Sequence, residues 1–322
     1  MNPSYHRWLE SEIRKQKFGS QPRSLYEPLR YIMGLGGKRL RPMLTLLSYS
    51  IYKNDVRNIV QVAVAIETFH NFTLLHDDIM DNAPLRRGRT AVHKKWNINT
   101  AILAGDVMQI KVYDMLLRVG DARLKEVLIA FNRCATGVCE GQQMDMEFET
   151  RSKVAEAQYL EMIRLKTAVL LGFSLKLGAI LADAPELDKK ALYEFGIQIG
   201  IGFQLKDDLL DVYGDMNKFG KQVGGDIIAN KKTFLLIKAL EKARGKNRLE
   251  LLHWLSMRKF DKTKKVKAVT AIYGALGIRE LTNEKINSYF ELGFNALEKL
   301  SVGPDKKTIL KDFTSRLMKR QA

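Results

Sequence analysis

Helical periodicity is the feature that most restricts how this chain of 322 residues can fold. Apolar residues recur at three- and four-residue steps in three long segments, residues 58–80, 155–177 and 285–300. That spacing places apolar side chains on one face of a helix, whereas strand-like alternation with hairpin dipeptides is hard to find. No linker rich in Pro, Ser or Gly and no solenoid repeat divides the sequence. We therefore expect a single all-α domain over residues 1–322.

The composition is that of a protein with a large buried core, because hydrophobic residues make up 46% of the chain. The longest apolar run, residues 167–182, is interrupted by Lys176 and is shorter than a bilayer span. The charged N-terminal segment has no apolar signal region. Cys134 and Cys139 are too few for a disulfide framework, and we expect both to be buried as small hydrophobic side chains. These features predict a cytoplasmic protein with no transmembrane segment.

The formal net charge of +17 is large enough to suit nucleic acids, anionic membrane surfaces or small anionic substrates. The basic residues are scattered among acidic ones, and the motifs of basic-region zippers, Cys/His fingers and aromatic RNA-binding surfaces are missing from the sequence. We therefore expect most of this charge to lie on solvated surface, and we predict no nucleic-acid partner.

Three aspartates close the first long apolar segment, in the sequence HDDIMD at residues 76–81. On a helix, Asp77 and Asp81 lie one turn apart on the same face, with Asp78 rotated to the side. Carboxylates crowded in this way repel one another unless a cation neutralises them. The motif therefore predicts either a cation site or a solvated acidic helix end.

The same pattern, Asp-Asp-x-x-Asp, recurs in KDDLLD at residues 206–211. Asp207 and Asp211 share a helix face, and Asp208 is the offset member. A set of carboxylates alone suits Mg²⁺, whereas zinc would require His or Cys and calcium an EF-hand loop. Two identical motifs at the ends of two apolar helices favour a magnesium site over two solvated helix ends.

Basic side chains accompany both acidic motifs. Residues 34–44, GLGGKRLRPML, break one helix with glycines and start the next, so Lys38 and Arg41 stand at a helix N-terminus that favours anions. Arg86 and Arg87 follow the first acidic motif. Lys221 and Lys231 lie near the second motif, and Lys166 stands with Thr167 at the head of the long apolar run. Metal-binding carboxylates beside such cations predict a diphosphate substrate, and an apolar helix-lined cavity would hold a hydrocarbon chain attached to it.

The clearest non-helical segment of the sequence is residues 212–233, which carries several glycines and lysines. A loop of this length and composition is more often a functional lid than a spacer. We expect it to cover the substrate and exclude water during the reaction.

The ordered set of motifs resembles the trans-isoprenyl diphosphate synthase (polyprenyl synthetase) family over nearly the full length. The motifs are GGKRLRP, HDDIMD with RRG, GQQMD, KTAVL, FQLKDDLLD, GKQVGGD and NKKT. The resemblance implies an isoprenoid synthase helical bundle around a central cavity, assembled as a homodimer. It also implies that the two aspartate-rich motifs face each other and bind three Mg²⁺ ions with an allylic diphosphate. Thr90-Ala91 stand where the family commonly has Pro-Thr, and a Pro often seen after NKKT is missing, but both departures lie outside the charged set.

The resemblance further implies a role for each matching position. The metal ligands are Asp77, Asp81 and Asp207. The catalytic set adds Asp78, Lys166 and Asp208, while Asp78 and Asp211 orient waters and lysines. The allylic diphosphate is bound by Arg86, Lys166, Lys221 and Lys231, with Thr167 and Gln204 nearby. The second substrate, isopentenyl diphosphate, is bound by Lys38, Arg41, His70 and Arg87. Gln142 lines the cavity near the first motif.

His70 would ordinarily be interpreted as a packed core residue of an apolar helix. It precedes Asp77 by seven residues and shares that face, which together with the motif match favours a substrate role. His76 lies off that face, and we expect it to be structural.

Product length in this family depends on the positions just before the first acidic motif, here Phe69, Phe72 and Thr73. An aromatic residue followed by a small one resembles short-chain synthases, so we predict a farnesyl or geranylgeranyl product and favour geranylgeranyl. The alternatives are a longer-chain polyprenyl diphosphate synthase and a class I terpene cyclase, which shares the first motif but carries a different second one.

Overall fold

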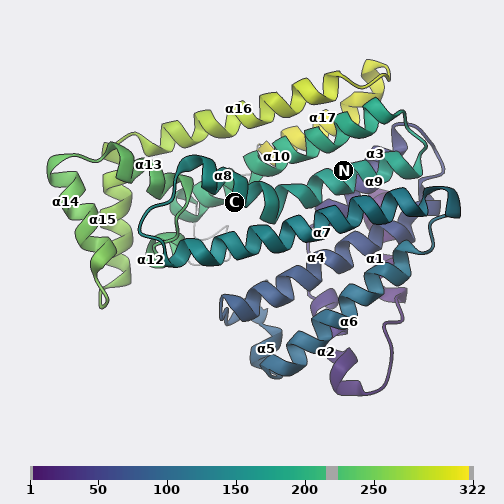
Figure 1. Cartoon of the computed structure of the whole chain (residues 1–322), viewed down its shortest axis with the longest axis horizontal. Coiled ribbons are helices and arrows are strands. Elements are labelled where there is room, and N and C mark those ends of the chain that lie inside the picture. Colours follow the sequence, from purple (N-terminus) through teal and green to yellow (C-terminus); the bar gives the residue numbers. More distant parts are fainter. Residues whose placement is uncertain (1–2, 215–223, 319–322) are drawn as a thin grey trace. The chain divides into compact units, whose positions relative to one another are not determined.

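A computed structural model of the chain describes residues 3–214 and 224–318 (Figure 1). Helices contain most of these residues, so the prediction of an all-α chain is confirmed. Those of the N-terminal half are α1 (Pro3–Lys15), α2 (Arg23–Gly34), α3 (Leu40–Ser50), α4 (Val60–Met80), α5 (Val92–Lys95), α6 (Ile98–Leu116), α7 (Asp121–Thr150) and α8 (Glu156–Ile163). Those that follow are α9 (Val169–Leu181), α10 (Glu186–Tyr213), α12 (Gly225–Ile228), α13 (Phe234–Lys242), α14 (Gly245–Ser256), α15 (Lys262–Ala275), α16 (Ile278–Glu298) and α17 (Pro304–Met318).

Four short elements complete the described structure. A 3₁₀ turn, η1, spans Val56–Ile59, and a π-helical turn, η2, spans Arg164–Ala168. Strands β1 (Leu85–Arg86) and β2 (Arg89–Thr90) form an antiparallel hairpin.

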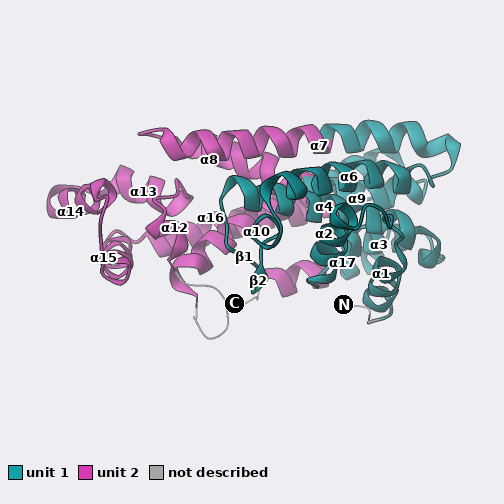
Figure 2. Cartoon of the chain, turned by 90° about the horizontal axis from the view of Figure 1, so that it is seen from below, with its two compact units in different colours: residues 1–133, 170–193, 299–310 teal, residues 134–169, 194–298, 311–322 magenta. Residues whose placement is uncertain are grey.

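The chain divides into two compact units (Figure 2). Unit 1 comprises residues 1–133, 170–193 and 299–310, and unit 2 comprises residues 134–169, 194–298 and 311–322. Each unit is thus assembled from segments that are distant in the sequence. The single domain expected from the sequence stays a prediction.

Helix α4 is the core helix of unit 1. From Val60 to Asn71 only Gln61 and His70 are not buried, because α1, α3 and α6 pack around this part of the helix. Helix α9 approaches α3 so closely that a Cβ atom on Gly178 would lie 2.3 Å from the carbonyl oxygen of Thr45. The continuous apolar sequence of α4 is therefore explained by burial on nearly all sides.

The backbone of the π turn η2 is closely packed in unit 2. A Cβ atom on Gly141 of α7 would lie 2.2 Å from the backbone nitrogen of Lys166, and one on Gly200 of α10 would lie 2.7 Å from Cα of Ala168. Two glycines therefore let α7 and α10 pack directly on the backbone of the turn. This packing fixes the positions from which Lys166 and Thr167 project.

Two sequence expectations need correction. Cys134 is buried but Cys139 is exposed, because a spacing of five residues on α7 turns the two side chains toward different faces. The segment 212–233 is also not wholly irregular, since it contains the end of α10 and the short helix α12. A four-residue helix is too short to produce a detectable periodicity. Residues 215–223 of that segment lie outside the described residues.

No helix in residues 3–214 and 224–318 combines the length and the apolar character that crossing a membrane requires.

Candidate active site

The first acidic motif stands at the C-terminal end of α4. Asp77 is half-buried in the last turn, and Asp81 is exposed at the cap, where its N–H donates to the carbonyl oxygen of Asp77 at 2.8 Å. Asp78 is buried, and Nε of Arg86 lies 3.0 Å from its Oδ1 and 3.1 Å from its Oδ2. Arg86 therefore neutralises the offset aspartate, while the other two remain on the accessible face.

The hairpin β1–β2 delivers Arg86 to this position. Arg87 and Gly88 connect the strands with φ angles of 52° and 73°, as a type I′ turn requires, and glycine adopts such an angle without strain. The side chain of Arg87 donates to the carbonyl oxygen of Gly36 in the loop before α3. A Cβ atom on Gly37 would lie 3.0 Å from the guanidinium carbon of Arg87, so this glycine makes room for the cation.

The N-terminus of α3 carries the basic residues that the sequence places there. Lys38 is exposed in front of the helix, and Arg39 adopts a left-handed conformation at the cap. Arg39 is buried and paired with Glu67 at 2.6 Å and Glu10 at 2.8 Å. It therefore anchors the loop, and its charge is already used by the two glutamates.

Arg41 and His70 contact each other directly, with Nη1 of Arg41 3.1 Å from Nε2 of His70. Burial, reinforced by the positive charges of Arg41 and Arg87, holds the pKa of His70 well below its ordinary range. The imidazole is therefore neutral, and its Nε2 accepts the hydrogen bond from the guanidinium. Unit 1 thus groups Arg41, His70 and Arg87, with Lys38 two residues from Gly36.

The second acidic motif lies near the end of α10 and repeats the arrangement of the first. Asp208 is buried and accepts hydrogen bonds from the hydroxyl of Tyr159 and from Nε2 of Gln204, the latter at 2.9 Å. Thr167 in turn donates to Oε1 of Gln204 at 3.1 Å. The offset aspartate is again held by its own partners, while Asp207 and Asp211 are half-buried.

Two acids of unit 2 have pKa values above the ordinary range of a carboxylate. Burial, together with Asp207, raises the pKa of Asp208 to about 6. Burial and the neighbouring Asp208 and Asp211 raise the pKa of Asp226 to about 7. Asp226 is tied to the motif, because its N–H donates to Oδ2 of Asp211 at 2.9 Å. Carboxylates destabilised in this way are suited to bind a cation.

Asp145 of α7 links the two lysines that the sequence assigns to the allylic diphosphate. Its Oδ2 lies 2.6 Å from Nζ of Lys166 and 3.9 Å from Nζ of Lys231. Burial acts to raise the pKa of Asp145, but the two ammonium groups outweigh it and lower the pKa. The carboxylate is therefore ionised between two cations.

Three functional candidates were missed in the sequence: Asp145, Tyr159 and Asp226. Asp145 ends the motif GQQMD and Asp226 ends GGD, so both stood in recognised motifs that offered a signal. Tyr159 offered none, because its contact with Asp208 joins residues 49 positions apart.

Gln142 is buried, and neither polar atom of its side chain has a hydrogen-bond partner within residues 3–214 and 224–318. Lys221 lies outside the described residues.

The predicted chain-length residues lie on one side of α4. Phe69 is buried, and its ring centroid lies 5.7 Å from that of Phe72 and 5.1 Å from that of Phe131. Phe72 also contacts the ring of His76 at 4.7 Å. The hydroxyl of Thr73 donates to the carbonyl oxygen of His70 at 2.8 Å.

His76 packs closely against Gly105 of α6. A Cβ atom on Gly105 would lie 2.2 Å from Nε2 of His76, so the glycine makes room for the ring. This contact supports the structural role expected of His76.

A metal ion would need more than the protein's own ligands. In the part of the chain that the structure describes, no three side chains of His, Cys, Asp or Glu lie close enough together to hold a metal. Mg²⁺ characteristically takes one or two carboxylates and completes its shell with waters and substrate phosphates. The sparse carboxylate sets of both units are of this kind. That the two sets face each other stays a prediction.

Comparison with known proteins shows the family to which the chain is similar. The polyprenyl synthetase family model matches residues 22–273. The chain is 46% identical over 236 residues to the geranylgeranyl pyrophosphate synthase of Geoglobus acetivorans, covering 72% of each protein. It is 44% identical over 232 residues to the short chain isoprenyl diphosphate synthase of Methanocaldococcus jannaschii, covering 71% of each. A crystal structure of a geranylgeranyl pyrophosphate synthase matches with a TM-score of 0.92 and 42% identity, covering 99% of this chain and 97% of the other.

The chain belongs to the polyprenyl synthetase family. It is an isoprenyl diphosphate synthase with the isoprenoid synthase fold, of the short-chain type, and its family uses a divalent metal.

Proposed function

We propose that this protein condenses isopentenyl diphosphate with an allylic diphosphate, head to tail, to give geranylgeranyl diphosphate. One observation carries the proposal. In both acidic motifs the middle aspartate is buried against its own partners, Arg86 for Asp78 and Tyr159 for Asp208. The outer aspartates of each motif are half-buried or exposed and share one helix face, in the arrangement that binding a metal diphosphate requires.

Magnesium is the proposed metal, with three ions held by Asp77, Asp81 and Asp207 together with diphosphate oxygens. When bound, the ions would stabilise the negative charge that grows on the departing diphosphate. The raised pKa values of Asp208 and Asp226 support a cation in unit 2, since a positive charge would relieve the repulsion between these acids.

The basic residues would form two groups, each of which binds the diphosphate of one substrate. Lys166 and Lys231, held by Asp145, would bind the allylic diphosphate, with Arg86, Lys221, Thr167 and Gln204 as the further members of that site. Lys38, Arg41, His70 and Arg87 would bind isopentenyl diphosphate, because unit 1 gathers three of them around the start of α3. Neutral His70 would offer a hydrogen bond there without adding charge.

The reaction would begin when the allylic C–O bond breaks and its electron pair leaves with the diphosphate. The double bond of isopentenyl diphosphate then attacks the allylic carbon and forms the new C–C bond. Loss of a proton from the resulting cation restores a double bond, and the released diphosphate accepts that proton. Lys166 and Lys231 would stabilise the leaving group throughout, and the segment 212–233 would exclude water that could capture the cation.

Product length would be limited by the aromatic side of α4. Phe72 lies between Phe69 and His76, so its ring stands where a growing hydrocarbon chain would pass along the helix. The bulk of two adjacent phenylalanines supports a short product rather than a long polyprenyl chain.

We also propose that the protein is a homodimer in which α6 covers α6 of a second copy. This helix exposes large apolar residues, including Leu103 and Ile110, which are seven residues apart and share a face. Exposed apolar residues that share a face are typical of association surfaces. Leu103→Glu with Ile110→Glu should convert the dimer to a monomer in analytical ultracentrifugation, and an unchanged mass would contradict the proposal.

The synthase proposal is tested by incubating the protein with isopentenyl diphosphate and Mg²⁺ and with each allylic diphosphate in turn. We expect geranylgeranyl diphosphate from farnesyl diphosphate, and no product in the presence of EDTA. Condensation with none of the allylic diphosphates would refute the proposal. Localisation in the cytoplasm stays a prediction.

A further inference from the structure

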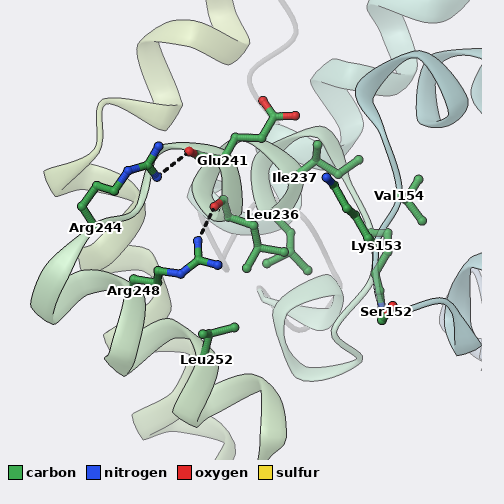
Figure 3. A pocket seen from close by; sticks show the side chains of 11 residues that line it. Ser152, Lys153, Val154, Leu236, Ile237, Glu241, Arg244, Arg248 and Leu252 are labelled. Carbon is green, nitrogen blue, oxygen red and sulfur yellow. Dashed lines mark hydrogen bonds between the residues drawn. The ribbon is translucent and has the colours of Figure 1, made fainter.

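A cavity of about 620 Å³ lies in unit 2, between the segment before α8, helix α13 and helix α14 (Figure 3). This volume falls within the range of about 300–1,000 Å³ that small-molecule sites occupy. Its lining shares no residue with the proposed metal and diphosphate ligands, although Lys232 belongs to the segment 212–233. The cavity is therefore a candidate for a second ligand.

Apolar side chains form one part of this cavity. Leu236 and Ile237 of α13 and Val154 before α8 line it and are buried. Leu252 of α14 lines it as well and remains 42% exposed. Figure 3 shows Leu236 between the arginines on one side and Lys153 on the other, with Leu252 below Arg248. An apolar surface between cations suits a molecule with a hydrocarbon part and an anionic part.

Four cations line the same cavity: Lys153, Lys232, Arg244 and Arg248. None of them forms an ion pair with a carboxylate of the residues that the structure describes. Nη1 of Arg244 donates to the carbonyl oxygen of Glu241 at 2.8 Å, and Nη1 of Arg248 donates to that of Leu240 at 3.4 Å (Figure 3). These bonds orient the guanidinium groups at the C-terminus of α13 but do not neutralise them.

The one acid of the lining does not compensate this charge. Glu241 is exposed, and its carboxylate lies 2.7 Å from Nζ of Lys238, which is outside the cavity lining. Capping of the C-terminus of α13 explains the positions of Arg244 and Arg248. It does not explain why Lys153 and Lys232 line the same cavity. The cavity therefore keeps four positive charges beside an apolar surface.

We propose that this cavity binds an amphiphile with a phosphate or diphosphate head and a hydrocarbon chain. Arg244 and Arg248 present planar donors that match phosphate oxygens, and the apolar side chains receive the hydrocarbon. The choice of a prenyl diphosphate as the ligand rests on the proposed function. The inference of an anionic, partly apolar ligand rests only on the charge and shape of the cavity.

The test titrates geranylgeranyl diphosphate, below its micelle concentration, into the full chain in EDTA with calorimetric detection. EDTA suppresses metal-dependent binding at the acidic motifs, and hydrogen exchange locates the ligand. We expect a binding event that protects residues 234–256. Arg244→Gln with Arg248→Gln should weaken it about tenfold or more, since two charge-assisted contacts are lost. The matched control, Lys246→Gln with Lys259→Gln, removes the same charge from exposed positions outside the lining and should change the Kd less than about twofold.

The same binding measurement is repeated with inorganic diphosphate and with vesicles containing phosphatidylglycerol. Tighter binding of the prenyl diphosphate than of inorganic diphosphate supports a site for both head and chain. If the protein binds vesicles but not the soluble amphiphile, and the arginine variant no longer binds the vesicles, the result supports the site and identifies a membrane lipid as its ligand. Binding of neither, or equal weakening in both double variants, overturns the proposal. Failure of the condensation reaction would refute only the proposed function, because this binding requires neither metal nor second substrate.

Discussion

Lys166 and Asp145 form an ion pair in unit 2, with Nζ of the lysine 2.6 Å from Oδ2 of the aspartate. Lys231 shares the same oxygen at 3.9 Å, so one carboxylate holds two cations from separate segments of the chain. The π turn η2 fixes the backbone of Lys166, and Asp145 fixes the end of its side chain. Together they preorganise both lysines for a diphosphate.

Asp145→Asn should therefore weaken use of the allylic diphosphate. The amide has the shape of the carboxylate but no charge to hold Lys166 and Lys231, so both side chains would gain freedom. We expect kcat/KM for the allylic substrate to fall by about tenfold or more, with KM for isopentenyl diphosphate nearly unchanged. Steady-state kinetics with each substrate varied in turn would measure this.

The control for this variant is Glu147→Gln, which removes a carboxylate from the same helix. Glu147 pairs with Arg151 in an exposed ion pair, so its loss should leave both KM values unchanged. A similar loss of activity in both variants would show that Asp145 has no specific role in positioning the lysines.

His70 should make the protein less stable as the pH falls below the ordinary pKa of histidine, about 6.5. Burial and neighbouring arginines lower its pKa in the folded state, so the unfolded chain binds a proton first. Stability is then fully present above pH 6.5 and is lost as the pH falls, by about 1 kcal/mol one unit lower.

The measurement is urea unfolding at about pH 7.5 and pH 5.5, compared between wild type and His70→Gln. Acids with raised pKa values, such as Asp208, change stability in the opposite direction over this range, but they do so equally in both proteins. The variant should lose the histidine contribution, whereas His253→Gln on exposed α14 should keep it. Equal pH dependence in wild type and His70→Gln would show that His70 is not responsible.

Phe72→Ala should lengthen the product. Phe72 contacts Phe69 and His76, so removing the ring opens space along α4 without removing any charged residue. Chromatography of the dephosphorylated products would show a longer chain than the wild type makes. Phe72→Tyr keeps the ring and should keep the product. Unchanged length in Phe72→Ala would place the limit elsewhere.

Gly141→Ala should damage both stability and catalysis. Its Cβ atom would lie 2.2 Å from the backbone nitrogen of Lys166, so α7 or the π turn must move. We expect a loss of about 1–3 kcal/mol in the free energy of unfolding, with lower activity even in the folded fraction. Gly274→Ala is the matched control, because no atom lies within 4 Å of the added Cβ. It should be neutral or stabilising by up to about 1 kcal/mol. Equal stability of the two variants would contradict the close packing at Gly141.

The all-α class followed from the spacing of apolar residues, since a period of 3.6 residues is a local property that the sequence carries directly. The same spacing placed Asp77 with Asp81 and Asp207 with Asp211 on common faces. The order of the charged motifs indicated the family. Each of these inferences uses residues that are close in sequence or motifs whose order is visible in it.

Other features depend on contacts between distant segments, and no local pattern carries them. Burial of Asp78 and Asp208 depends on Arg86 and Tyr159, which reach them from the hairpin and from α8. The role of Asp145 depends on two lysines brought to one oxygen. The exposure of Cys139 depends on which face of α7 is covered.

The sequence by itself determined the helices, the paired aspartates and the class of chemistry, because these follow from periodicity and residue type. Only the tertiary structure decided which carboxylate of each motif is buried against partners from distant segments. It also decided which lysines are held together and where unpaired cations meet an apolar cavity. The physical reason is that charge and burial in a folded protein are set by neighbours in space, and packing of distant segments chooses those neighbours.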